Sequence, residues 1–321
     1  MAIPPAPAAA GDPFAYGVPV CEEGSPIDFD TGGCSILNPR VVFRGVVNPK
    51  QPDYNDVYEL SLDGKWHCNN LCATTALKGE SPGTDADPTA YVSGNCNGVA
   101  KVNYVDTAAI GQLSLTDPGW TFSFISSGTT PAAWPTLGRA FGYWDFDNSV
   151  ERVVYRGTPP NDHEIFELSK GQGQSAWMCN NLSTNDKSEA PAPPAAADPF
   201  GYCYGGVPRV IYVGIDGHIY ELHPEAVGWR WADLNKATGG APDAVSSPYA
   251  YVAGVARVLY IDANAQIIEL ALEPSGWKWN NLSTNDKSAK PAPPALGNPF
   301  GYIGFDGIPR VIYRSTDGHI Y

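Results

Sequence analysis

The sequence predicts an all-β fold, and three observations carry this prediction. Glycine and proline number 34 and 30 among 321 residues, which suits many turns between short strands. Aromatic residues make up 12% of the chain, with 17 tyrosines and 9 tryptophans, as is common in β-sheet proteins. No window shows a sustained i, i+3, i+4, i+7 apolar pattern, so helices longer than about two turns are not expected.

A short phrase that ends in tyrosine recurs along the chain and predicts the first strand of a repeat. Its best copies are "DPFGY", ending at Tyr202, and "NPFGY", ending at Tyr302. Degraded copies end at Tyr16, Tyr91, Tyr143 and Tyr251. Successive tyrosines are separated by 75, 52, 59, 49 and 51 residues, so the period is that of a small structural repeat.

Two further strands are predicted after each phrase. A β-branched run comes first and begins at Pro39, Ala100, Glu151, Pro208, Ala256 and Pro309. A third run follows, as in "DVYEL", "EIFEL" and "HIYEL". Between the second and third runs, the Asp-Gly pairs at 216–217 and 317–318 predict tight hairpin turns.

The fourth run carries a tryptophan at one repeated position. These residues are Trp66, Trp120, Trp177, Trp229 and Trp277. Two positions later, and therefore on the same face of a strand, come Cys68, Phe122, Cys179, Trp231 and Trp279. We expect both sets to fill the wedge between neighbouring sheets. The sixth repeat has no tryptophan run before Tyr321.

Four short strands in about fifty residues are the pattern of a β-propeller blade. The sequence therefore predicts one domain over 1–321, a single β-propeller of about six four-stranded blades of which the last is incomplete. The repeats lie at roughly 12–72, 87–126, 139–183, 198–235, 247–283 and 298–321. Two nearly identical stretches rich in proline and alanine, which begin at Asn180 and Asn280, are interpreted as joints between blades.

The charge of the chain limits its partners. The formal net charge is −14, so the protein repels phosphate backbones and nucleic acid is not an expected partner. No apolar run reaches the length of a membrane span. The start, "MAIPPAPAAAGDPF", lacks the basic and apolar segments of a secretory signal, so we expect a cytosolic protein, export by another route, or a signal already removed.

The cysteines do not form a recognisable framework, because seven of them occur at irregular spacing. Cys21 and Cys34 lie in one predicted loop and could pair, whereas Cys68 and Cys72 are a weak CxxxC signal without a second pair. We expect most of the cysteines to be buried apolar residues, and we predict no metal or other cofactor.

The repeat phrases also resemble a known family. "GHIYELHPEAVGWRWADLNKATGGAPDAVSSPYAYVAGVARVLYID" and "PRVIYRSTDGHIY" are similar to repeats of the fucose-binding bacterial β-propeller lectins of the Photorhabdus type. The resemblance is close over 180–321 and looser over 12–180. It implies fucose or related sugars bound in shallow pockets between blades, and glycans as partners. The family has seven regular blades, whereas six uneven repeats are found here.

A sugar site needs an aromatic surface for the apolar face of the ring and a few fixed donors and acceptors for the hydroxyls. The ligand-binding residues expected on this basis are Trp229, Trp231, Trp277, Trp279, Arg209, Arg257 and His218. The alternative interpretation is that these tryptophans only pack one blade on the next. Many weak equivalent sites would make the protein a multivalent lectin.

Two other functions stay open. A propeller enzyme would have one site at the channel mouth, and a scaffold would bind no small ligand. The third-run glutamates Glu59, Glu167, Glu221 and Glu269 could suggest paired carboxylates for glycoside hydrolysis. They hold one equivalent position in each repeat, however, and repeated residues are usually architectural. Metal ligation by His163, His218 and His319 is not expected, because no two lie in a plausible ligand cluster.

Overall fold

The computed structural model describes residues 13–20, 36–45, 56–63, 65–74, 84–94, 98–117, 119–136, 138–184, 190–226, 228–285, 291–304 and 306–321. The chain divides into two compact units, and each is described by itself. Unit 1 comprises Met1–Thr158 and Glu167–Asn180, and unit 2 comprises Pro159–Phe166 and Asn181–Tyr321.

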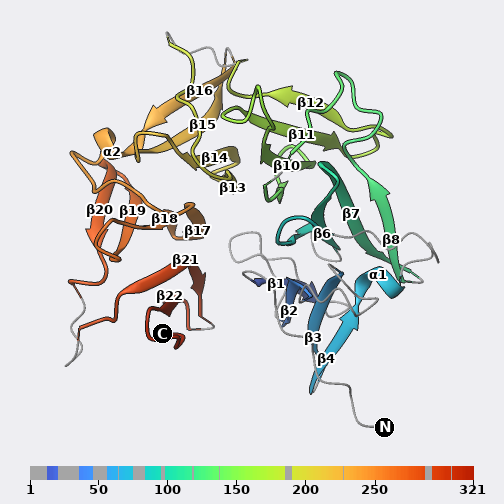
Figure 1. Ribbon diagram of the computed structural model, residues 1–321, viewed down its shortest axis with the longest axis horizontal. Helices are drawn as coiled ribbons and strands as arrows, with labels where there is room; N and C mark the ends of the chain where they lie inside the picture. Colours follow the sequence, from blue (N-terminus) through green and yellow to red (C-terminus); the bar gives the residue numbers. More distant parts are fainter. Residues whose placement is uncertain are drawn as a thin grey trace. The chain divides into compact units, whose positions relative to one another are not determined.

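Unit 1 is built from four-stranded sheets in which each strand pairs with the next one along the chain (Figure 1). Sheet 1 consists of β1 (Phe14–Val20), β2 (Ile36–Arg44), β3 (Val57–Asp63) and β4 (Lys65–Asn70). Sheet 2 consists of β5 (Thr89–Ser93), β6 (Val99–Asp106), β7 (Ala109–Thr116) and β8 (Gly119–Phe124). Most of sheet 3 also lies in this unit, with β9 (Phe141–Asp145), β10 (Val150–Arg156), β11 (Ile165–Gly171) and β12 (Met178–Asn181).

Unit 2 repeats the same arrangement. Sheet 4 consists of β13 (Phe200–Tyr204), β14 (Val207–Val213), β15 (Ile219–Glu225) and β16 (Gly228–Asp233). Sheet 5 consists of β17 (Tyr249–Ala253), β18 (Val255–Ile261), β19 (Ile267–Glu273) and β20 (Gly276–Asn281). Sheet 6 has two strands, β21 (Ala295–Ile303) and β22 (Pro309–Ser315). The expected four strands per repeat are therefore found in five sheets of the described chain, while sheet 6 has only its first pair and a bridge from Arg314 to Ile320.

The predicted hairpin turns between second and third strands are confirmed. Gly217 and Gly318 have φ angles of +83° and +85°, a conformation that glycine adopts without strain. In the first of these turns, the amide of Gly214 donates a hydrogen bond of 2.8 Å to the carbonyl of His218.

Within each unit, one face of a sheet packs on the opposite face of the next sheet. In unit 1, Val42 and Val57 of sheet 1 share a buried cluster with Tyr104 and Leu113 of sheet 2, and Trp120 and Phe122 of β8 pack against it. In unit 2, Leu259 and Ile261 of sheet 5 share a cluster with Tyr313 and Val311 of sheet 6. Strands alternate their side chains between faces, so these clusters use only one face of sheet 1 and one face of sheet 5.

The proline-rich joints of unit 2 are fastened to the sheet that follows them. The hydroxyl groups of Tyr212 and Tyr260 donate to the carbonyls of Pro193 and Pro242, at 3.0 and 2.7 Å. Tyr313 donates in the same way to Pro293, at 3.1 Å. Each of these tyrosines lies in the second strand of its sheet, so the fastening recurs with the repeat.

The tryptophans of the fourth strands are not equally buried. Trp277 is 9% exposed, whereas Trp66 and Trp279 are 48% and 40% exposed. The expectation of uniform wedge filling is therefore wrong for Trp66 and Trp279. In unit 1, the Trp120 and Phe122 pair does pack on the neighbouring sheet, as predicted.

The remaining expectations concern helices, cysteines and charge. The helices of the described chain, α1 (Leu71–Thr74) and α2 (Leu234–Ala237), have four residues each, and neither could cross a membrane.

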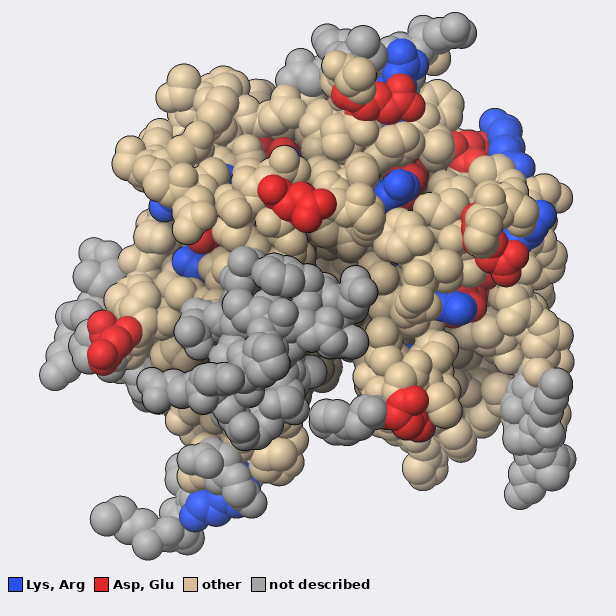
Figure 2. Space-filling model, turned by 180° about the vertical axis from the view of Figure 1, so that it is seen from behind, with Lys and Arg blue, Asp and Glu red and all other residues tan. Residues whose placement is uncertain are grey.

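The cysteines differ in burial. Cys21 and Cys34 lie outside the described residues; Cys72 and Cys179 are buried, and Cys68 is half-buried. On the face shown in Figure 2, acidic and basic side chains lie close together in several small groups.

Candidate functional site

A buried trio of polar side chains occupies one face of sheet 4. Tyr202 on β13 and Arg209 on β14 are direct register partners, and Glu221 on β15 lies on the same face. The hydroxyl of Tyr202 donates to Glu221 Oε1 at 2.7 Å, and Nη1 of Arg209 donates to Glu221 Oε2 at 2.6 Å. Glu221 is 1% exposed. Because a buried carboxylate is costly unless it is paired and hydrogen-bonded, the trio is a coupled unit.

The same trio recurs in three other sheets. In sheet 1 the guanidinium of Arg40 donates to both oxygens of Glu59 at 2.8 Å, and Tyr16 donates to Glu59 at 2.7 Å. In sheet 5, Arg257 and Tyr251 donate to Glu269 at 2.6 and 2.9 Å. Sheet 3 carries Tyr143, Arg152 and Glu167, with Arg152 at 2.9 Å from both carboxylate oxygens.

The tyrosines of the trios in sheets 1, 4 and 5 stay protonated, because burial raises the pKa of each. Burial raises the pKa of Tyr202 well above its ordinary value, and the adjacent Glu221 carboxylate raises it further. The pKa of Tyr251 is raised for the same two reasons, burial and Glu269. Each phenol is therefore a fixed donor that orients the carboxylate over the whole physiological pH range.

Three of the arginines keep one donor unused. The Nε atoms of Arg40, Arg209 and Arg257 are buried and have no hydrogen-bond partner among the described residues. Buried N–H groups are almost always paired in folded proteins, so an unpaired one in the same position of three sheets indicates a partner outside the described residues, such as water or a ligand. A guanidinium held at Nη1 by its glutamate presents Nε in a fixed direction.

Sheet 3 supplies that partner internally. Nε of Arg152 donates to Asp145 Oδ2 at 3.1 Å, and Nη2 lies 3.0 Å from the same oxygen. Burial lowers the pKa of Arg152, but Glu167 and Asp145 outweigh it, and the net shift is upward. Asp145 is fully buried, so the donor that is unused in sheets 1, 4 and 5 is satisfied here.

Sheet 2 departs furthest from the pattern. Lys101 and Gln112 replace the arginine and the glutamate, and Gln112 donates to Tyr91 at 3.0 Å. The carboxylate comes from sheet 3 instead, because Glu151 accepts from Tyr91 at 3.2 Å and lies 3.7 Å from Nζ of Lys101. In sheet 6, Arg310 pairs with Asp306 at 2.6 Å rather than with a third-strand glutamate.

The structure brings together only some of the residues that were predicted to bind the ligand. Arg209 and Arg257 both belong to trios, but Trp231 and Trp279 pair with Leu222 and Leu270, on the sheet face opposite the trio of their own sheet. Trp229 and Trp277 lie two positions earlier on those same faces. The indole nitrogen of Trp231 donates to the carbonyl of Ala190 in the joint, at 2.9 Å.

His218 lies away from the Arg209 trio. Its Nδ1 is 2.9 Å from Asp233 Oδ2, and Asp233 also caps helix α2 by accepting from the amide of Lys236. Four strand positions, about 13 Å, separate this end of β14 from Arg209. Of the Arg209 and Arg257 trios, the candidate set omitted Tyr202, Glu221, Tyr251 and Glu269, and it contained no member of the trios in sheets 1 and 3. Their signal is a spacing of twelve residues from arginine to glutamate, seen in both sheets 4 and 5.

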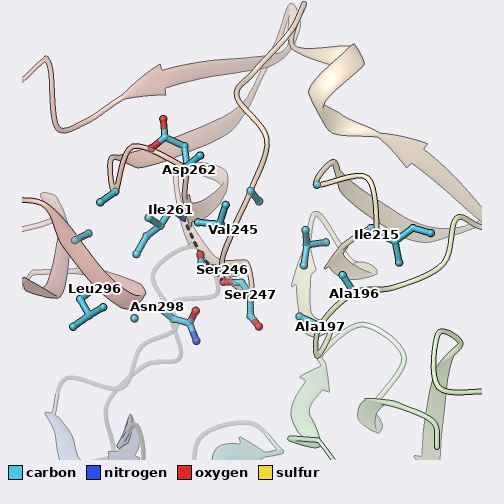
Figure 3. Close-up of a pocket in the computed structure, with 18 residues that line it drawn as sticks. Ala196, Ala197, Ile215, Val245, Ser246, Ser247, Ile261, Asp262, Leu296 and Asn298 are labelled. Atoms are coloured by element: carbon cyan, nitrogen blue, oxygen red, sulfur yellow. Dashed lines mark hydrogen bonds between the residues drawn. The ribbon is translucent and has the colours of Figure 1, made fainter. Parts of the chain in front are cut away.

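A pocket of about 700 Å³ lies elsewhere in unit 2 and is lined by equivalent positions of three sheets (Figure 3). Ala196, Val245 and Leu296 follow the bridging alanines of sheets 4, 5 and 6, and Ser246, Ser247 and Asn298 add polar groups. Among the described residues that line it, Asp262 is the ionisable one, and its carboxylate accepts from the amides of Asn264 and Gln266 in its own turn. The pocket therefore lacks the paired carboxylates of a glycosidase.

No protein-family model matches the sequence, and no curated protein matches it. Solved structures do match. AofleA from Arthrobotrys oligospora superposes with a TM-score of 0.58 at 15% identity, over 97% of this chain and 81% of that one. The fucose-specific lectin from Aleuria aurantia gives 0.57 at 12%, over 96% and 89%. The lectin SapL1 in complex with α-methyl fucoside gives 0.53 at 14%, over 93% and 87%.

One structure of the Aleuria aurantia lectin, with a TM-score of 0.52, is described as a six-bladed β-propeller. This chain has the β-propeller fold. Sheets 1 to 5 are therefore blades 1 to 5 of the propeller, and the strand pair of sheet 6 is called blade 6 below. In blades 1 and 5, the trio lies on the face that packs on the following sheet of the same unit. At these identities the likeness shows the fold alone.

Proposed function

We propose that the protein is a carbohydrate-binding lectin that takes fucose or a related neutral sugar between adjacent blades. The observation that carries the proposal is the unpaired Nε of Arg40, Arg209 and Arg257 beside a fixed carboxylate. A donor and an acceptor held side by side suit adjacent sugar hydroxyls, each of which both donates and accepts. The structurally similar lectins of Aleuria aurantia and SapL1 bind fucose or a fucoside, which supports fucose as the first sugar to test.

The aromatic part of each site comes from the following blade in this proposal. Trp120 and Phe122 of blade 2 pack against the same buried cluster as Tyr16 of blade 1. Trp277 and Trp279 hold the same positions in blade 5, so we assign them to the site of blade 4 with Arg209. Trp229 and Trp231 cannot serve the trio of their own blade.

The remaining parts of the assignment belong to the same proposal. We infer one propeller domain over 1–321 with six blades, of which the last is incomplete. The bacterial Photorhabdus-type affiliation rests on the repeat phrases. A neutral sugar is favoured because a net charge of −14 repels anionic ligands wherever no local arginine is available. A single site will be weak, since a monosaccharide buries little area, and presentation on a surface strengthens binding by avidity.

The first test is calorimetry of the full chain with L-fucose, comparing the wild type with a triple Arg→Lys variant at positions 40, 209 and 257. Lysine keeps the charge beside each glutamate but lacks Nε, so the variant stays folded and loses about tenfold or more in affinity. Arg314→Lys, on the exposed part of β22, is the matched control and should bind like the wild type.

The outcome that contradicts the proposal is clear. If the folded wild type gives no heat with millimolar fucose or with a panel of other neutral monosaccharides, the lectin assignment is wrong. If the triple variant binds fucose as tightly as the wild type, the trios are not the sites. Circular dichroism and thermal unfolding establish that both proteins are folded.

A further inference from the structure

Blade 4 carries a row of basic side chains beside its trio. Val210 pairs with Leu222, so the next register position brings Arg209 beside His223, and His223 pairs in turn with Arg230. The three side chains therefore lie in one line across β14, β15 and β16, on the face that holds Glu221. Strands are about 4.8 Å apart, so the row spans about 10 Å, the length of a monosaccharide with one substituent.

The other blades with a complete register do not repeat this row. The equivalent positions are Arg257, Ala271 and Lys278 in blade 5, Arg40, Ser61 and His67 in blade 1, and Lys101, Ser114 and Thr121 in blade 2. A histidine between two arginines is thus a feature of blade 4 among these blades. A repeated architectural role does not explain it.

Each member of the row has a buried nitrogen without a hydrogen bond to any described residue. These atoms are Nε of Arg209, Nδ1 of His223 and Nε of Arg230. Two carboxylates lie nearby. Glu221 Oε2 is 3.4 Å from His223 Nδ1, and Glu225 Oε2 is 2.8 Å from Arg230 Nε, an ion pair without hydrogen-bond geometry.

The two carboxylates differ in how firmly they are held. Glu221 is fixed by Tyr202 and Arg209, whereas Glu225 is half exposed and can move into solvent. If Glu225 moved away, the side chains of Arg230 and His223 would be available to bind a ligand. Three clustered donors, two of them on guanidinium groups, match an oxygen-rich anionic group better than a sugar hydroxyl.

We propose that the site of blade 4 accepts an anionic sugar, whose sulfate ester or carboxylate lies on His223 and Arg230 while its ring occupies the Arg209 trio. This inference rests on the proposed sugar site, and it specifies the class of sugar that blade 4 binds. Blades 1 and 5 keep the preference for neutral sugars. A sulfate ester and a carboxylate both present negatively charged oxygens to these side chains, and the experiment distinguishes the two groups.

The test titrates the full chain, with its histidine ring nitrogens labelled, with L-fucose, an O-sulfated fucose and glucuronic acid, and follows NMR signals and heat. We expect the sulfated fucose to bind about tenfold more tightly than fucose and to shift the His223 ring signals among the five histidines. Arg230→Gln should remove the advantage of the sulfated sugar. Lys278→Gln, at the matched position of blade 5, should retain it, and Glu225→Gln should increase it.

The outcomes separate the two proposals. If fucose binds but the sulfated sugar binds no more tightly, or if Arg230→Gln weakens both equally, the anionic site is wrong and the lectin assignment stands. If neither sugar binds to the folded protein, both fail. A larger gain with glucuronic acid than with sulfated fucose identifies a carboxylate as the preferred group, and the reverse identifies a sulfate.

Discussion

At the scale of single residues, the chemistry of this protein depends on which partner each arginine already has. Arg209 is held at Nη1 by Glu221 and keeps Nε free for a ligand, whereas Arg152 donates Nε to Asp145. The two arginines occupy the same strand position in their repeats. In the proposed lectin, one neighbouring side chain therefore decides whether this arginine binds a sugar.

The arginine of blade 6 provides a pH-dependent test of such pairing. Hydrogen bonds from the Arg310 guanidinium, and then from the amide of Ile308, lower the pKa of Asp306 to about 2. The folded pKa is below the unfolded one, so the pair stabilises its turn above about pH 4 and loses this contribution as the pH falls through 2. Arg310→Met should raise the pKa of Asp306 toward its ordinary value of about 3.9, as measured by NMR titration of the carboxyl carbon.

Asp317 is the internal control for that titration. Its pKa is also about 2, but the causes are the amide of His319 and the hydroxyl of Tyr321. It should not respond to Arg310→Met. If Asp306 still titrates near pH 2 in the variant, the guanidinium is not the main cause of the shift.

At the scale of strands and sheets, much of the architecture was readable in the sequence and the site was not. The repeated Tyr, β-branched and Trp runs predicted the strand order of blades 4 and 5, because alternation and turn residues are local properties. The arginine and glutamate of a trio are 12 to 19 positions apart, and its tyrosine lies up to 43 positions from the glutamate. In the sequence, Glu221 was interpreted as architectural because it recurs. Counting the parity of strand positions would have placed Arg209 and Trp231 on opposite faces. Which arginine is already satisfied depends on Asp145, and no sequence pattern marks that contact.

The packing of one blade on the next also yields a prediction. A side chain at Gly301 of β21 would collide with the ring of Tyr251, which donates to Glu269 in blade 5. Gly301→Ala should therefore cost about 1–3 kcal/mol in the free energy of unfolding and weaken the site of Arg257. Chemical denaturation and fucose titration measure the two effects.

Gly171→Ala in β11 is the matched control, since the nearest atom to its added Cβ, 3.3 Å away, belongs to the flexible side chain of Gln174. It should be nearly neutral. Equal destabilisation by both substitutions would show that the loss comes from the strand backbone and not from contact with Tyr251.

At the scale of the whole molecule, the repeats are alike in fold and unequal in function. The trios of blades 1, 4 and 5 leave Nε without a partner among the described residues, whereas the donors of blades 2 and 3 are satisfied by Glu151 and Asp145, both of blade 3. We therefore expect fewer sugar sites than blades.

We expect a stoichiometry of about three fucose molecules per chain, measured by calorimetry at high protein concentration. Asp145→Ala should free Nε of Arg152, which stays paired with Glu167, and raise the number toward four. Lys101→Arg alone should not add a site, because the new arginine would still be paired with Glu151. A wild-type stoichiometry of five, or no increase with Asp145→Ala, would contradict the role of Nε.

The hydrogen bond from Tyr212 to Pro193, repeated from Tyr260 to Pro242 and from Tyr313 to Pro293, ties three repeats of unit 2 to the joint that precedes each of them. Both ends of each bond lie in the same stretch of chain, about twenty residues apart. A gene segment that is duplicated or lost therefore carries its own attachment with it, and no compensating change is required in the neighbouring repeats. The number of blades can change in evolution by whole steps, while each copy is left free to gain or lose its ligand.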